Sequence, residues 1–156
     1  QANPALGLLA GLGMTLTVQS SSATIAMLQT VAAQPGPDGV HGLLSLAGAI
    51  PVLLGDNIGT TITAVLASIG QGKDAKRVAA AHAIFNLSGA AVCCGLLGPF
   101  AALVQALSPA GPECAVIARQ IANAHTLFNV CCALVWLPLT GRMVRLVTRL
   151  LPDRAA

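Results

Sequence analysis

Long apolar blocks alternate with short polar connections along this chain. Each of the four blocks is long enough for a membrane-spanning helix, which needs about 20 residues. The blocks comprise residues 4–33, 42–70, 78–107 and 114–139. The connections comprise residues 34–41, 71–77 and 108–113, and a tail, residues 141–156, follows the last block. The pattern predicts an all-α integral membrane fold over residues 1–140, with helices at 78–107 and 114–139.

The first block is interrupted near its centre by four polar residues. Gln19, Ser20, Ser21 and Ser22 stand side by side, with no charged residue near them. The apolar arm on each side is too short to cross about 30 Å of hydrocarbon at 1.5 Å per residue. The block can form one long helix with the polar group at its centre, or a re-entrant hairpin with that group at its tip. We expect the hairpin, over residues 4–33.

Serines at such a tip can bind an anion or a cation. Ser is a favoured N-cap, so Ser20–Ser22 can begin the second arm, whose free N–H groups and positive dipole end favour an anion. The hydroxyl groups add donors for the oxygens of an anion and acceptors for a cation. A structural role is the alternative, because serines in membrane helices also bond to the carbonyl four residues back or join neighbouring helices.

The second block carries a similar interruption. Residues 55–59, with the sequence GDNIG, contain two glycines, an Asp and an Asn, and Pro51 precedes them by one turn. These residues weaken a helix, so we expect a broken helix over 42–70, in which Asp56 or Asn57 caps a new half-helix. Asp56 is also the only acidic residue far from a connection, and ionisable groups inside a membrane are functional-site candidates. Capping and function are compatible roles.

A short polar pattern occurs twice in the second half of the chain. The segment AHAIFN, residues 81–86, returns as AHTLFN at residues 124–129. In each copy a His and an Asn are four residues apart and share one helix face; the pairs are His82 with Asn86 and His125 with Asn129. A metal-binding pair at this spacing would need a second His or a carboxylate. We expect these residues to support the interrupted segments, through structural hydrogen bonds or by direct contact with an ion.

Composition agrees with a membrane location. Only 8% of the residues are charged and 55% are hydrophobic, whereas a soluble domain has about 25% charged residues. The net charge of +3 does not indicate a nucleic-acid partner, because nearly all the basic residues lie in two places. Seven of the eight Lys and Arg residues lie in connection 71–77 and in the tail: Lys73, Lys76, Arg77, Arg142, Arg145, Arg149 and Arg154.

The basic residues also predict which side of the membrane each connection faces. Two spans separate connection 71–77 from the tail, so both lie on one side, which the positive-inside rule makes cytoplasmic. Connections 34–41 and 108–113 have no Lys or Arg and are expected outside. We therefore predict a multi-pass protein of the plasma (inner) membrane. Its cytoplasmic tail is expected to form a short interfacial helix against anionic headgroups, with a calmodulin-type partner helix as the alternative.

Cysteine and serine usage gives no indication of enzyme chemistry. The five cysteines show no C-x-x-C spacing, so we expect small buried hydrophobes and not a metal site or a disulfide framework. The serines have no His base nearby in the sequence, as a nucleophilic serine requires. We expect no catalytic residue and no cofactor.

Four motifs, in this order, resemble the type II sodium/phosphate cotransporters and their bacterial homologues: QSSSATIAM, LGDNIGTTITAVLAS, AHAIFNLSG and IANAHTLFN. The resemblance covers residues 8–140. It implies two inverted repeats, each with a Q-S-S-S hairpin and an N-I-G-T segment, with phosphate and sodium bound where the repeats meet. This chain has one copy of each motif, so it resembles one half of an inverted-repeat transporter, and its basic tail is more similar to the second repeat of bacterial members. The resemblance also implies that the hairpin enters from outside.

By position, the resemblance implies a substrate and ion site where the hairpin tip meets the second block. Its residues would be Gln19, Ser20, Ser21, Ser22, Asn57, Gly59, Thr60 and Thr61. The supporting residues would be His82, Asn86, His125 and Asn129. Sodium ligands would be among Gln19, Ser20, Thr60 and Thr61. We add Asp56 to the site; it departs from the small neutral residue of vertebrate members, which leaves open the number of sodium ions and any part played by protons.

The implied function is secondary active transport, in which sodium entry as the coupling ion drives the uptake of inorganic phosphate. The implied partners are sodium, phosphate, the lipid bilayer and a second inverted repeat, in the same protein or in a partner chain, with no nucleic acid. Two alternatives remain: a sodium symporter for another small anion, such as a carboxylate or arsenate, and a non-transporting membrane partner subunit.

Overall fold

The computed structural model describes residues 3–37 and 41–153, and over these residues the protein is built of helices. The elements are α1 (Pro4–Val18), α2 (Ser21–Ala32), α3 (Leu46–Ala67), α4 (Lys73–Gly95), α5 (Leu97–Ala106), α6 (Glu113–Trp136), the short 3₁₀ helix η1 (Leu137–Leu139) and α7 (Thr140–Leu150). Three stretches in this part are long and apolar enough to span a membrane: Leu46–Ala67, Lys73–Gly95 and Glu113–Leu150. The all-α membrane fold predicted from the sequence is confirmed.

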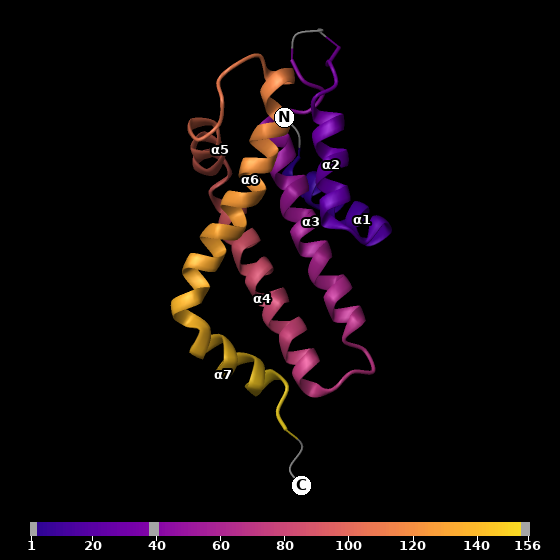
Figure 1. The fold of residues 1–156 in the computed structure, drawn as a ribbon, viewed down its shortest axis with the longest axis vertical. Helices are drawn as coiled ribbons and strands as arrows, with labels where there is room; N and C mark the ends of the chain where they lie inside the picture. The colour runs from indigo at the N-terminus through magenta and orange to yellow at the C-terminus, as the bar shows by residue number, and fades with distance from the viewer. Residues whose placement is uncertain (1–2, 38–40, 154–156) are drawn as a thin grey trace.

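The helices form an elongated bundle (Figure 1). Helices α3 and α6 run along most of its length, α4 lies in the lower part, and α1, α2 and α5 lie in the upper part in this view. The connections from α2 to α3 and from α5 to α6 lie at one end, and the α3–α4 connection and α7 lie at the other. The buried core is formed where α3 meets α2 and α6, and its fully buried side chains include Leu53, Leu54, Ile117 and Ile121.

The first apolar block folds as the predicted hairpin. Helix α1 ends at Val18 because Gln19 adopts a left-handed conformation, with φ of 55°, and its N–H donates to the Thr15 carbonyl at 2.6 Å. Ser20 is extended and acts as the N-cap of α2, where its hydroxyl oxygen accepts from the Ala23 N–H at 3.4 Å. The chain therefore reverses at these two residues, and the four polar side chains stand at the tip.

The predicted break at residues 55–59 is wrong, because α3 runs without interruption from Leu46 to Ala67. The glycines serve packing against α1 instead. A Cβ added at Gly55 would overlap the Leu8 carbonyl oxygen, and one at Gly59 would lie 2.7 Å from the Thr15 Cβ. Small residues at this spacing let two helix backbones approach closely.

Asn57, which we expected to cap a new half-helix, instead bonds within α3. Its amide nitrogen donates to the Leu53 carbonyl at 2.9 Å, which lies one turn earlier in the same helix. Asp56 accepts a hydrogen bond from α1 instead of capping. Both polar groups thus find partners without any interruption of the helix.

The third block is also not the single helix predicted for residues 78–107. Helix α4 begins earlier, at Lys73, and ends at Gly95, while α5 begins at Leu97. Pro99 falls in the first turn of α5, where its missing N–H costs nothing, and inside a longer helix it would remove a backbone hydrogen bond. Of the two helices, only α4 is long enough to span a membrane.

The last block agrees closely with the predicted helix 114–139. Helix α6 ends at Trp136, and η1, which contains Pro138, turns the chain into α7. Helix α7 runs across the end of the bundle (Figure 1). It buries Val147 and leaves its arginines exposed. Arg154 and residues 38–40 of the first connection lie outside the described residues.

Candidate functional site

The hairpin tip touches α3 through two hydroxyl groups. Ser21, the first residue of α2, and Thr60, in the second half of α3, have their side-chain oxygens 2.9 Å apart. The Thr60 hydroxyl also donates to the Asp56 carbonyl at 3.0 Å. Because a hydroxyl has one proton, Ser21 is the donor to Thr60 in this pair. Two residues that are 39 positions apart in the sequence are thus joined inside the bundle.

The rest of the tip is open to its surroundings. Gln19, Ser20 and Ser22 are exposed, and Ser21 is half-buried. The first backbone N–H groups of α2 have no partner within the helix, as at any helix N-terminus, and they carry the positive end of its dipole. The tip therefore presents hydroxyl groups, one amide side chain and N–H donors on a single surface.

Asp56 lies one turn before Thr60 and is completely buried. Its Oδ1 accepts from the Thr15 hydroxyl of α1 at 2.5 Å. Its Oδ2 has no hydrogen-bond partner among the described residues. A buried carboxyl oxygen without a partner is costly, and a cation placed beside it would be stabilised.

The remaining α3 residues of the predicted site form contacts within α3 or with α1. The Thr61 hydroxyl donates to the Ile58 carbonyl at 2.7 Å, and Asn57 bonds to α3 as described above. Gly59 packs against Thr15. Thr60 is therefore the α3 side chain that the structure brings to the tip, whereas these three stabilise the helix or its packing against α1.

The two repeated His/Asn segments have the same local geometry. The Asn86 amide donates to the His82 carbonyl at 3.1 Å, and the Asn129 amide donates to the His125 carbonyl at 2.9 Å. These are structural hydrogen bonds within α4 and α6. The His125 side chain in addition lies close enough to Asp56 to act on it electrostatically. Of the four supporting residues, His125 is therefore the one whose charge would act on the buried carboxyl.

Sequence reasoning missed Thr15, which joins Asp56 to the hairpin. The relevant signal is a second pattern of small residues. Gly7, Gly11 and Thr15 recur every four residues on α1, and Gly55 and Gly59 do so on α3. A Cβ at Gly11 would overlap the Val52 carbonyl oxygen. Matching stripes of this kind indicate two helices in close contact, and Thr15 lies on the stripe opposite Asp56.

Comparison with known proteins adds an independent finding. A family model described as Na+/Pi-cotransporter matches residues 1–123. The chain is 39% identical over 102 residues to the uncharacterized protein YqeW of Bacillus subtilis, an alignment that covers 65% of this chain and 31% of YqeW. It is 44% identical over 88 residues to the sodium-dependent phosphate transport protein 2C of Homo sapiens, with 54% of this chain and 14% of that protein covered.

A further relative is the sodium-dependent phosphate transport protein 2B of Bos taurus. It is 42% identical over 89 residues, which are 54% of this chain and 12% of that protein. The chain therefore spans less than a third of the length of each of these relatives. No solved structure matches it.

Proposed function

Because this chain belongs to the Na+/Pi-cotransporter family, we propose that it forms one repeat of a secondary active transporter that couples sodium entry to inorganic phosphate uptake. The observation that carries the proposal is the contact of Ser21 with Thr60. It joins the short hairpin to a helix that is long and apolar enough to span a membrane. It would place polar groups at membrane depth, an arrangement on which many secondary transporters build their sites.

The phosphate would bind at the start of α2. An anion there is favoured by the helix dipole and by the free N–H groups of the first turn. The hydroxyls of Ser20 and Ser22 and the amide of Gln19 supply further donors to the phosphate oxygens. Ser21 would join them by turning its proton from Thr60 to the ligand. All four belong to the exposed or half-exposed tip, so a ligand can reach them.

Sodium would bind beside the phosphate, with ligands among Gln19, Ser20, Thr60 and Thr61. Of these, the Thr60 oxygen has the position that fits best, because it faces the tip, whereas the Thr61 hydroxyl is bonded within α3. The negative charge of Asp56, one turn from Thr60, would add to the attraction. Sodium would also offset part of the charge of the phosphate.

A second repeat, in the same protein or in a partner chain, would complete the site. Two features support this part of the proposal. The tip is exposed within this chain, whereas a transport site must be enclosed on alternate sides. The related transport proteins are also several times longer than the segment matched here. Rocking of one repeat against the other would then switch access to the site.

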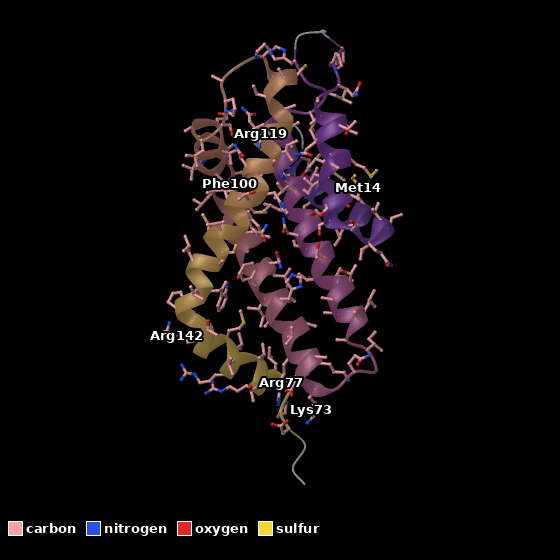
Figure 2. The ribbon with its side chains drawn as sticks, in the orientation of Figure 1. Met14, Lys73, Arg77, Phe100, Arg119 and Arg142 are labelled. Atoms are coloured by element: carbon pink, nitrogen blue, oxygen red, sulfur yellow. The ribbon has the colours of Figure 1, made fainter. Side chains whose placement is uncertain are left out.

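The charge distribution supports a cytoplasmic tail in a plasma (inner) membrane. Lys73, Arg77 and Arg142 lie at one end of the bundle and Arg119 lies toward the other (Figure 2). The end with α7 carries six of the basic residues that the structure describes, and the positive-inside rule favours the cytoplasm for such an end. The hairpin would then open to the outside.

The test is phosphate uptake into proteoliposomes, with and without a sodium gradient. Ser21→Ala and Thr60→Ala should each reduce sodium-driven uptake by at least about tenfold, as expected when a hydrogen bond to a charged ligand worth about 1.5–3 kcal/mol is removed. Thr30→Ala is the matched control, because Thr30 is exposed on α2 and its hydroxyl bonds only within that helix, at 2.9 Å.

Each outcome has a distinct meaning. Normal uptake by both site variants would show that the serines only hold helices together. Uptake of phosphate that does not respond to sodium would contradict the coupling. Sodium-driven uptake of a carboxylate or arsenate in place of phosphate would favour the alternative symporter, and no uptake of any anion by the intact protein would favour a non-transporting subunit.

A further inference from the structure

An apolar groove lies between α4, α5 and α6, away from the hairpin tip. Its volume is about 410 Å³. The floor is formed by buried side chains of Cys93, Phe128 and Cys132, and the rim includes Val92, Leu103 and Val135, which are exposed. The groove is therefore open on the side where these spanning helices would meet the bilayer.

The Trp136 and Ser88 side chains in the wall of the groove already form hydrogen bonds within the protein. The Trp136 indole N–H donates to the Ser88 hydroxyl oxygen at 3.1 Å. The Ser88 hydroxyl in turn donates to the Phe85 carbonyl at 3.1 Å. A polar ligand would find no free partner in this pair, so the groove is suited to a flexible apolar chain.

Basic side chains follow directly after the groove. Trp136, at the end of α6, lines the groove, and η1 leads from it into α7, with Arg142 in the first turn. Arg142 projects from the outer side of the bundle (Figure 2). Arg142 and Arg145 are exposed, and neither forms an ion pair within residues 3–37 and 41–153.

The other basic cluster at this end differs. Arg77 is paired with Asp74 and Asp153, at 3.2 and 2.9 Å, and Lys73 is 4.0 Å from Asp153. The positive charge of that cluster is largely balanced within the protein. The positive charge of Arg142 and Arg145, on the first turns of α7 beside the groove, is not balanced by an ion pair within the described residues. An occupant with an apolar chain and a negatively charged end would match both the apolar groove and these two arginines.

We propose that the groove holds an acyl chain of an anionic phospholipid whose headgroup is bound by Arg142 and Arg145. The apolar wall takes the chain, and the two arginines select the headgroup. The site is separate from the hairpin tip and does not depend on the proposed transport function. It would link the protein to the anionic leaflet on the side of α7.

Trp136 provides a direct measurement, because it is the only tryptophan of the 156 residues. The chain is reconstituted in nanodiscs that contain phospholipids with brominated acyl chains, which quench tryptophan fluorescence on contact. Brominated phosphatidylglycerol and brominated phosphatidylcholine are compared at equal bromine content. We expect the anionic lipid to compete for the groove about thirtyfold better, the effect of two basic side chains at a membrane surface at about 1 kcal/mol each.

A reporter outside the groove gives the matched control. Leu134 is exposed on α6 and does not line the groove, so Leu134→Trp in a Trp136→Phe background reports on ordinary surrounding lipid. This reporter should be quenched equally by both lipids. Equal quenching of Trp136 by both lipids would overturn the proposal. Quenching at position 134 without any at Trp136 would also overturn it, because protein and not lipid would then cover the groove.

The arginines are tested separately. Arg142→Gln with Arg145→Gln should abolish the preference of Trp136 for the anionic lipid while quenching itself persists. Arg149→Gln is the control, because Arg149 is exposed near the other end of α7, and it should keep the preference. An equal loss in the control would show general surface attraction instead of a site, and an unchanged preference in the double variant would exclude the arginines as headgroup ligands.

Discussion

At the scale of single residues, two hydrogen-bonded pairs join the hairpin to α3: Ser21 with Thr60, and Thr15 with Asp56. The serines were identified because four polar residues interrupt an apolar block. The Thr60 partner of Ser21 came from the family resemblance. The contact of Thr15 with Asp56 was missed, because it depends on how α1 packs against α3. The sequence indicates that packing only indirectly, through the spacing of small residues.

Asp56→Asn tests the buried charge. Asn keeps an oxygen that can accept from the Thr15 hydroxyl, so the fold should persist, while the negative charge is lost. If Asp56 contributes to a sodium site, the sodium concentration that half-activates uptake should rise at least about tenfold, because a contact with a charged group is worth about 1.5–3 kcal/mol.

Thr15→Val is the companion variant, since it keeps the charge of Asp56 and removes its hydroxyl partner. We expect a smaller shift in sodium activation than for Asp56→Asn. Identical sodium activation in Asp56→Asn and in the parent protein would assign this carboxyl a purely structural role.

At the scale of elements, the two predicted interruptions had different outcomes. The break at Gln19 and Ser20 was predicted because a run of N-cap residues favours the start of a helix. The break at residues 55–59 was wrong, because glycine permits either a bend or a close approach of two helices, and here Gly55 and Gly59 pack against α1. The break between α4 and α5 was missed although Pro99 signalled it, because the apolar pattern continues across it.

Gly11→Ala tests this close approach. The added Cβ would overlap backbone atoms of Val52, which cannot move without a shift of α3. Overpacking of this kind destabilises by about 1–3 kcal/mol, so we expect a lower midpoint of thermal unfolding in detergent. Gly13→Ala, on the same helix with open space around it, should be neutral or slightly stabilising, since alanine favours helix over glycine. Equal midpoints for the two variants would contradict tight packing of α1 on α3.

At the scale of the whole molecule, the order of the spans and the placement of charge were predictable. Counting apolar blocks and basic residues correctly put connection 71–77 and the tail at one end of the bundle (Figure 1). The hydrogen bonds that join connection 71–77 to the end of the tail helix were not predictable. Arg77 donates to the Leu151 carbonyl at 2.8 Å and Lys73 donates to the Pro152 carbonyl at 2.6 Å, contacts that require α7 to run back across the bundle.

Arg77→Gln should loosen the end of α7. The lost bonds from a charged donor, reduced by partial exposure to solvent, correspond to about 1 kcal/mol, or roughly fivefold faster amide hydrogen exchange over residues 147–151. Lys76→Gln is the control, since Lys76 is exposed and forms no ion pair in the described part of the chain. Exchange that is unchanged in Arg77→Gln would show that α7 is held by its apolar face alone.

In the proposed placement of the protein in the membrane, the half-length hairpin would also shape the electric field. Helices α1 and α2 are 15 and 12 residues long, so their tip would stop part of the way through the bilayer, and water above it would shorten the insulating path. An ion that reaches Ser21 from the loop end would cross only part of the membrane voltage. Its binding would then change with voltage by a fraction of about 2.3 kcal/mol per unit charge per 100 mV.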